Sequence, residues 1–244
     1  MRIGIISDIH GNLPALEAVL RDIEGRGVDA LYCLGDLVGY APFPNEVTER
    51  IRAMDMPVIM GNYDDGVGFD RDDCGCAYKD PGEKERGDRS LMWTRRHVTA
   101  EHKAYLREFL KELRFRADGK RVLLVHGSPR KMNEYLFEDR AISTFQRIAA
   151  ASGADIIVFG HTHKPYTKLV DGVLFVNAGS VGKPKDGDWR ACYAILEPAA
   201  AEPVRFIRLP YDLEKVTTAI RASDLPHEFA VDLERGGAAV TAQP

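Results

Sequence analysis

The amino-acid sequence predicts an α/β fold with a two-sheet β-sandwich core flanked by helices. The first half of the chain alternates short apolar runs with helical patterns, at the spacing typical of parallel strands joined by right-handed crossovers. The second half contains Asp171-Gly172 between two apolar runs, which is a strong β-hairpin signal. The chain has 244 residues, of which 45% are hydrophobic, enough for a globular core. We therefore expect a single domain over residues 1–222.

The first 60 residues show the order strand, helix, strand, helix, strand. The strands are expected at residues 2–6, 31–34 and 58–60, and the helices at residues 14–24 and 45–54. In the first helix, Leu16, Val19 and Ile23 recur at spacings of three and four and so share one face. Asn45 is the predicted N-cap of the second helix, because its side-chain oxygen can accept a backbone N–H bond.

An insertion interrupts this alternation at about residues 64–113. Residues 64–88 are rich in Asp, Gly and Lys, and they predict a long loop. Two helices are expected after it, at residues 88–97 and 100–113. Thr99 is the predicted N-cap of the second of these helices.

The second half of the chain is predicted to add strands in a largely antiparallel arrangement. Strands at residues 121–125 and 156–159 are expected to continue the parallel series, and the antiparallel strands are those on either side of the Asp-Gly turn and at residues 190–197 and 204–209. Helices are expected at residues 139–151 and 213–222. Residues 223–244 contain a Gly-Gly-Ala-Ala stretch, and we expect a partly disordered C-terminal tail there.

The composition excludes several classes of protein. The net charge of −4 argues against general nucleic-acid coating or membrane-surface binding, but it allows a local phosphate site. No run approaches the ~20 apolar residues of a membrane helix, and the N-terminus lacks a signal pattern. Cys33 and Cys192 lie in apolar, strand-like runs, and no disulfide framework is indicated. A cytoplasmic protein fits best, and the sequence does not indicate an oligomeric state.

Seven polar side chains follow the five apolar strands of the first two thirds of the chain. They are Asp8, His10, Asp36, Asn62, His126, His161 and His163. Taken singly, each could be a buried structural histidine or a turn residue. Parallel α/β sheets, however, bind ligands just beyond the carboxyl ends of their strands. The gathering of these groups at strand ends therefore indicates one shared site.

The types of these groups point to metal binding. Imidazoles and carboxylates suit borderline divalent ions such as Mn, Fe, Co, Ni or Zn. No cysteine is among them, which argues against a closed thiolate zinc site. Seven ligands are too many for one tetrahedral ion, but they suffice for two ions if one carboxylate bridges. Two ions ~3.5–4 Å apart can clamp a phosphate for in-line displacement and lower the pKa of a shared water.

The motifs "DIH", "GD", "GN", "HG" and "GHTH" occur in this order over residues 8–163, and with them the sequence resembles the calcineurin-like metallophosphoesterases. "DIHGN" and "VNAGSVG" further resemble the small bacterial phosphodiesterase branch, whose members are compact cytoplasmic enzymes in which Mn or Ni often serve. The resemblance implies a two-sheet sandwich with a di-metal site. It implies the following ligand assignment: Asp8, His10 and His163 on one metal, Asn62, His126 and His161 on the other, and Asp36 as the bridge.

The residue after Asn62 departs from this family. Many members have a histidine there, which can protonate the leaving group, whereas this chain has Tyr63. A phenol with a pKa near ~10 is a poorer acid than imidazolium near neutral pH. This difference favours phosphodiesters over monoesters with poor leaving groups.

The leading hypothesis is a di-metal phosphoesterase that hydrolyses phosphodiesters, including nucleotides or cyclic nucleotides, with a metal-bridging hydroxide as nucleophile and Mn as the favoured metal. One alternative is a phosphomonoesterase or protein phosphatase using the same site. Another is a metal-loaded protein-interaction module on the same fold.

Further candidates remain open at this stage. His97 and His102 on the inserted helices are either solvated, or one of them replaces the general acid that is absent after Asn62. The catalytic candidates are therefore Asn62, Tyr63 and His97. Substrate contact or a turn cap is expected for three residues close to ligands in sequence: Asn12, Tyr40 and Ser128. Arg130 and Lys164 can add positive charge to the rim.

The pair Cys74 and Cys76 is also unassigned. One C-x-C pair alone is weak evidence for a metal site. An active-site lid, a redox role or a plain loop are the other interpretations.

Overall fold

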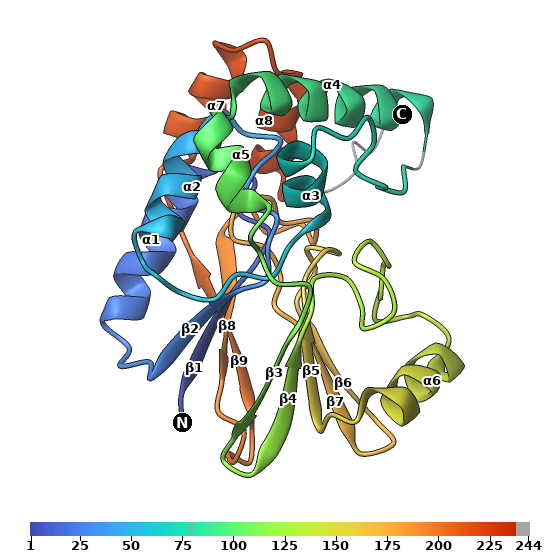
Figure 1. Cartoon of the computed structure of the whole chain (residues 1–244). Coiled ribbons are helices and arrows are strands. Elements are labelled where there is room, and N and C mark those ends of the chain that lie inside the picture. Colours follow the sequence, from blue (N-terminus) through green and yellow to red (C-terminus); the bar gives the residue numbers. More distant parts are fainter. Residues whose placement is uncertain (79, 238–244) are drawn as a thin grey trace, which may run out of the picture.

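The computed structural model describes residues 1–78 and 80–237, and it confirms the predicted α/β fold with two sheets (Figure 1). The first sheet contains, in spatial order, β2 (Ala30–Cys33), β1 (Ile3–Ile6), β8 (Ala191–Leu196) and β9 (Val204–Leu209). The second sheet contains β3 (Leu113–Ala117), β4 (Lys120–Leu124), β5 (Ile156–Phe159), β7 (Val173–Asn177) and β6 (Tyr166–Val170). Parallel pairs join β1 to β2, β4 to β5 and β5 to β7.

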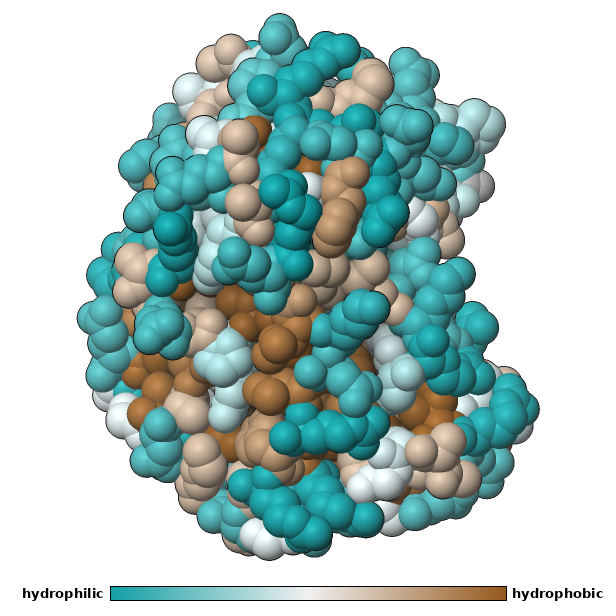
Figure 2. All heavy atoms as spheres, in the orientation of Figure 1, coloured by the Kyte–Doolittle hydropathy of each residue, from teal (hydrophilic) through white to brown (hydrophobic). Residues whose placement is uncertain are grey.

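The two sheets face each other across an apolar core. Side chains alternate along each strand, because successive residues of a strand point to opposite faces. Ile3 and Ile5 of β1 and Val122 of β4 point into the space between the sheets. Leu123 and Ile157 point outward from the second sheet instead. In the lower half of Figure 2, hydrophobic residues, coloured brown, are visible between hydrophilic residues, coloured teal.

Helices cover the outer faces of the sandwich and one of its ends. The helices of the described residues are α1 (Leu13–Glu24), α2 (Pro44–Arg52), α3 (Asn62–Gly68), α4 (Pro81–His97), α5 (Ala100–Leu106), α6 (Ile142–Ser152), α7 (Leu213–Arg221) and α8 (Glu228–Glu234). The apolar face of α1 packs on the first sheet, and that of α6 packs on the second. Helices α3, α4, α7 and α8 lie at the end of the sandwich where β1 finishes (Figure 1).

Two predicted elements are shorter than expected. The predicted strand at residues 58–60 forms only isolated bridges, Cys33 to Val58 and Ile59 to Leu110. The helix predicted at residues 100–113 ends at Leu106. The chain then enters β3, which pairs with β4 through a tight turn at Asp118-Gly119. Both turn residues have positive φ, as this kind of hairpin requires.

The inserted segment contains more helix than predicted. Residues 62–68 form α3, and α4 begins at Pro81, with Asp80 accepting a backbone N–H bond from Glu83. Thr99 caps α5 as predicted, with its hydroxyl accepting from the N–H of His102. Asn45 is not the N-cap of α2, because Phe43 occupies that position and Pro44 follows it.

The predicted tail is largely ordered where the structure describes it. Residues 228–234 form α8, which packs against α7, and residues 238–244 lie outside the described part of the chain. Phe229, Ala230 and Leu233 of α8 are buried against α7 and Ala41. The expectation of partial disorder over residues 223–244 stays a prediction, and α8 occupies residues of that range that precede the two glycines.

We expect Phe229→Ala to lower the free energy of unfolding by about 3–5 kcal/mol, since it removes a large buried ring. Phe69→Ala is the matched control, because Phe69 is 46% exposed, and it should cost less than about 1 kcal/mol. Urea unfolding followed by circular dichroism measures both variants. Equal losses would show that α8 contributes little to the folded state.

Candidate metal centre

The structure brings all seven predicted side chains together at one end of the sandwich. They come from the loops after β1, β2, β4 and β5 and from the first residue of α3. All seven are buried, none exposing more than 3% of its surface. Buried polar groups require hydrogen-bond or metal partners. Each of these seven side chains must therefore have such a partner.

The backbone at this cluster is unusual. Asp8, His10, Asp36, His161 and His163 all have φ between 50° and 65°. This left-handed conformation costs about 1–3 kcal/mol for a non-glycine residue, and it persists only where the surroundings impose it. Backbone bonds do so here: the N–H of Asp8 donates to Gly35 O, and that of His10 donates to Asp36 O, each at 2.9 Å.

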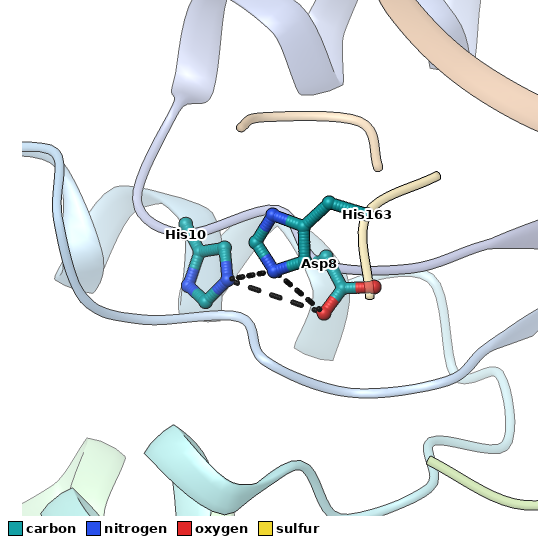
Figure 3. Close-up of side chains that lie close together, drawn as sticks. All are labelled: Asp8, His10 and His163. Atoms are coloured by element: carbon teal, nitrogen blue, oxygen red, sulfur yellow. Dashed lines mark hydrogen bonds and ion pairs between the residues drawn. The ribbon is translucent and has the colours of Figure 1, made fainter. Parts of the chain in front are cut away.

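Asp8, His10 and His163 form one group of potential ligands (Figure 3). The Nδ1–H of His10 donates to Val38 O at 3.0 Å, and that of His163 donates to Lys183 O at 2.5 Å. These bonds fix the tautomers, so both Nε2 lone pairs face the same point. The two Nε2 atoms lie 3.2 Å apart, and His163 Nε2 lies 3.4 Å from Asp8 Oδ1.

Asp36, His126 and His161 form a second group. The Nδ1–H of His126 donates to Leu34 O at 2.7 Å, and its Nε2 atom faces Asn62 Oδ1 at 3.2 Å. Asp36 Oδ2 lies 3.5 Å from His126 Nε2 and 3.6 Å from His10 Nε2. One oxygen of Asp36 therefore faces both groups.

This arrangement fits two divalent cations. Among the described residues, the buried side-chain atoms without a hydrogen-bond partner are Asp8 Oδ1 and His161 Nε2, one in each group. Leaving a buried polar atom unsatisfied costs about 1–3 kcal/mol. Facing lone pairs on nitrogen and oxygen repel each other, whereas a cation between them would satisfy every one. Imidazole with carboxylate is a donor set that such ions favour.

The protonation of the histidines is compatible with metal binding. Burial lowers the pKa of His10 to about 4, and it lowers the pKa values of His161 and His163 well below their ordinary value. These three rings are therefore neutral near pH 7, as a ligand must be. Burial also acts to lower the pKa of His126, but the Asp36 carboxylate outweighs it and raises that pKa to about 9. A metal ion would have to displace a proton from this ring.

Asp64 supports the site, and the sequence analysis missed it. Its buried carboxylate accepts N–H bonds from Asp36 at 2.7 Å, Leu37 at 2.9 Å and Gly61 at 3.1 Å. It therefore ties the "GD" loop to the "GN" turn. A signal was available, because an acidic residue three positions after a helix N-cap commonly bonds the N-cap N–H.

Asn62 is held by a cysteine. Its Nδ2 donates to Cys76 Sγ at 3.2 Å, which orients Oδ1 toward His126. Cys74 Sγ lies 2.8 Å from Cys76 Sγ. The C-x-C pair therefore contacts the metal centre through Asn62.

Tyr63 is a core residue. Its ring is 1% exposed and stacks edge-on against His10, and its hydroxyl lies 3.5 Å from Gly87 O. Burial raises its pKa well above the ordinary value for tyrosine. Its backbone N–H donates to Asp36 Oδ1 at 2.8 Å.

The remaining histidine candidates have other partners. His97 stacks on Trp93 and bonds Trp93 O at 2.7 Å. His102 bonds Asn45 and pairs with Glu49. These contacts agree with the helix-surface alternative for both residues.

Of the three residues predicted to contact substrate, Asn12 and Ser128 form hydrogen bonds within the protein, and Tyr40 lies beside the metal centre. Asn12 caps α1 and also donates to Gly182 O. Ser128 donates to Glu134 and accepts N–H bonds within its own turn. Tyr40 is half-buried, with its ring centroid 4.9 Å from that of His10, so its contact with substrate stays a prediction.

The family model of the calcineurin-like phosphoesterase superfamily domain matches residues 1–200 of the chain. An uncharacterized protein of Methanocaldococcus jannaschii is 33% identical over 241 residues, which cover 92% of this chain and 93% of that protein. Phosphodiesterase YfcE of Escherichia coli K12 is 28% identical over 207 residues, which cover 81% of this chain and 88% of YfcE.

Solved structures agree with this match. A metallophosphoesterase from Sphaerobacter thermophilus is 32% identical with a TM-score of 0.76, and the match covers 97% of this chain and 99% of that one. A hypothetical protein from Pyrococcus horikoshii is 26% identical with a TM-score of 0.84, covering 98% and 99% of the two chains.

In the described part of the chain, no helix is both long and apolar enough to cross a membrane.

We expect the apo protein to take up close to two equivalents of divalent metal. Asp36→Asn should lower this number to about one, because it removes the negative charge of a carboxylate that faces both groups. Elemental analysis after reconstitution and gel filtration measures it, with Asp22→Asn as a control remote from the centre. Two tightly held equivalents in Asp36→Asn would contradict the bridging assignment.

Cys76→Ala should weaken metal binding about 10-fold or more, because partners that orient a ligand typically contribute 10–100-fold in affinity. Cys76→Ser should restore most of the affinity, since its hydroxyl can accept the same bond from Asn62. Cys74→Ala is the control, because the contacts of Cys74 are with Cys76 and Tyr78. Competition with a chromophoric chelator measures all three, and equal affinities for Cys76→Ala and wild type would exclude the orienting role.

Proposed function

The chain belongs to the calcineurin-like phosphoesterase superfamily and is a metal-dependent phosphoesterase, and we propose that it hydrolyses phosphodiesters at the candidate metal centre. Water would add across one P–O ester bond, leaving a phosphomonoester and an alcohol. Linear and cyclic nucleotides are candidate substrates. The relative named phosphodiesterase YfcE supports this choice of ester.

The observation that carries the proposal is the position of Asp36. Its Oδ2 faces both groups of the metal centre, at 3.6 Å from His10 Nε2 and 3.5 Å from His126 Nε2. The family depends on two metal ions, and we propose that Asp8, His10 and His163 hold one, that Asn62, His126 and His161 hold the other, and that Asp36 contacts both. When bound, such a pair supplies a water of lowered pKa and positive charge for the phosphate oxygens.

The side chains of the protein prepare the site for this chemistry. Hydrogen bonds from Nδ1 to backbone carbonyls hold the rings of His10, His126 and His163 in place before any substrate arrives. Asn62 contributes a neutral oxygen, so it adds no negative charge to oppose the phosphate. Manganese is our proposed metal, and it is one of several divalent ions that suit imidazole, carboxylate and amide donors without a thiolate.

The preference for diesters rests on the buried state of Tyr63. Its raised pKa and the position of its hydroxyl beside Gly87 O make it unsuited to donate a proton to a leaving group. Esters whose leaving groups need little protonation should therefore react best. We also propose a cytoplasmic location, which is consistent with the four free thiols of the chain.

The test of this proposal is a screen of divalent metals with bis-p-nitrophenyl phosphate and p-nitrophenyl phosphate. We expect kcat/KM to be higher for the diester, with Mn among the activating metals. A higher value for the monoester would favour the phosphomonoesterase alternative. Hydrolysis of neither ester with any metal would overturn the proposed activity.

Tyr63→Phe should lower kcat/KM on an activated aryl diester by less than about tenfold, since general acid catalysis contributes ~10²–10⁴-fold where it operates. Tyr193→Phe is the matched control, because Tyr193 is also buried and its hydroxyl bonds Asp22 away from the centre. A hundredfold loss in Tyr63→Phe, with metal content unchanged, would make Tyr63 a catalytic residue.

A further inference from the structure

A groove of about 680 Å³ opens beside the metal centre. One wall comes from the loop between β4 and α6, and the other comes from residues 77 and 78 of the inserted segment. Three aromatic and three basic residues dominate the lining: Tyr78, Tyr135, Phe137, Arg130, Lys131 and Arg140. The volume lies in the range typical of small-molecule sites, ~300–1,000 Å³.

The groove adjoins the metal centre at Tyr135, which is part of its lining. The ring centroid of Tyr135 lies 4.0 Å from that of His161. A molecule in the groove therefore lies next to the ester that the centre would cleave.

The aromatic residues form a platform for a planar group. Tyr135 and Phe137 stack with an angle of 16° between their planes and 5.6 Å between their centroids. Phe137 exposes 37% of its surface, which is high for a phenyl side chain in a folded protein. Tyr135 is partly buried beneath this ring. An exposed aromatic ring such as that of Phe137 can bind nucleobases by stacking, without selecting one base.

The basic residues give the groove a local positive charge in a chain whose net charge is −4. Arg130 is neutralised by Glu134, which lines the same groove. Within the described residues, Lys131 and Arg140 are exposed and form no ion pair. Two unpaired cations beside an aromatic platform favour an anionic ligand that also carries a ring.

We infer that this groove binds the nucleoside side of the diester, with the base on Tyr135 and Phe137 and a further phosphate near Lys131 and Arg140. The inference rests on the proposed function and narrows its substrate class to nucleotides that carry a second phosphate besides the one cleaved. Small alkyl or aryl diesters would reach the metal centre without using the groove.

Three substrates with one leaving group test the inference in the Mn-loaded enzyme. They are methyl p-nitrophenyl phosphate, thymidine 5′-(p-nitrophenyl phosphate) and the same thymidine ester with a 3′-phosphate. We expect kcat/KM to rise at least tenfold when the nucleoside replaces methyl, and at least threefold again with the 3′-phosphate. The second increase should shrink at high ionic strength, because exposed charges are screened.

Variants separate the two parts of the groove. Phe137→Ala should reduce the ratio of kcat/KM for the thymidine ester to kcat/KM for the methyl ester at least fivefold. Phe69→Ala, at another exposed phenylalanine, should leave this ratio unchanged. The double variant Lys131→Ala/Arg140→Ala should remove most of the gain from the 3′-phosphate. Arg116→Ala is its control, at an exposed arginine on β3.

The outcomes separate the inference about the groove from the proposed phosphodiesterase activity. Hydrolysis of all three esters at similar rates, or ratios unchanged in the groove variants, would overturn the groove while leaving the phosphodiesterase proposal intact. If no ester is hydrolysed with any metal, the proposed function fails, and calorimetric binding of thymidine 3′,5′-bisphosphate decides the groove. Weaker binding to Phe137→Ala than to Phe69→Ala would then support it, and equal binding would overturn it.

Discussion

The structure depends on holding seven buried polar side chains, which we propose as metal ligands, close together at one end of the sandwich. Such a cluster resists its own formation, because facing acceptors repel and buried polar atoms lose hydration. Backbone carbonyls counter this by binding the Nδ1–H of His10, His126 and His163, so each ring has one direction in which to point. The positive φ values of the ligand residues show the same constraint in the backbone. The rest of the fold supplies the rigidity that maintains it.

Two glycines show how little space this constraint leaves. A Cβ on Gly61 would lie 2.1 Å from Asp36 Oδ1, and a Cβ on Gly160 would lie 2.0 Å from Ser7 Oγ and 2.5 Å from Asp8 Oδ2. Any side chain there would displace a carboxylate that faces the metal centre. The glycines of the "GN" and "GHTH" motifs are therefore explained by packing against ligands from other strands. A motif that looks local in the sequence is set by contacts between distant segments.

Features that depend on neighbouring residues in the chain could be predicted from the sequence. Features that depend on contacts between distant segments could not. The ligand groups could be found because each follows an apolar strand directly, as His126 does. Strand β3 was missed because its pattern gains meaning only through pairing with β4. Asn45 was predicted to cap α2, but it bonds His97 O and the N–H of Thr99, some 50 residues away. Tyr135 gave no signal at all, since nothing in its sequence neighbourhood shows that its ring lies against His161.

The segment at residues 74–78 connects the metal centre with the groove. Cys76 accepts a hydrogen bond from Asn62, and Asn133 Nδ2 donates to Gly75 O at 2.8 Å on the groove side. Ala77 and Tyr78 of this segment line the groove together with Tyr135. One short segment therefore orients a proposed metal ligand and ties together the two walls of the groove. These contacts favour a fixed wall over a plain loop, because a change at Cys76 would reach both Asn62 and the ring against His161. The insertion that interrupts the α/β alternation therefore contacts both the metal centre and the groove that we propose for substrate.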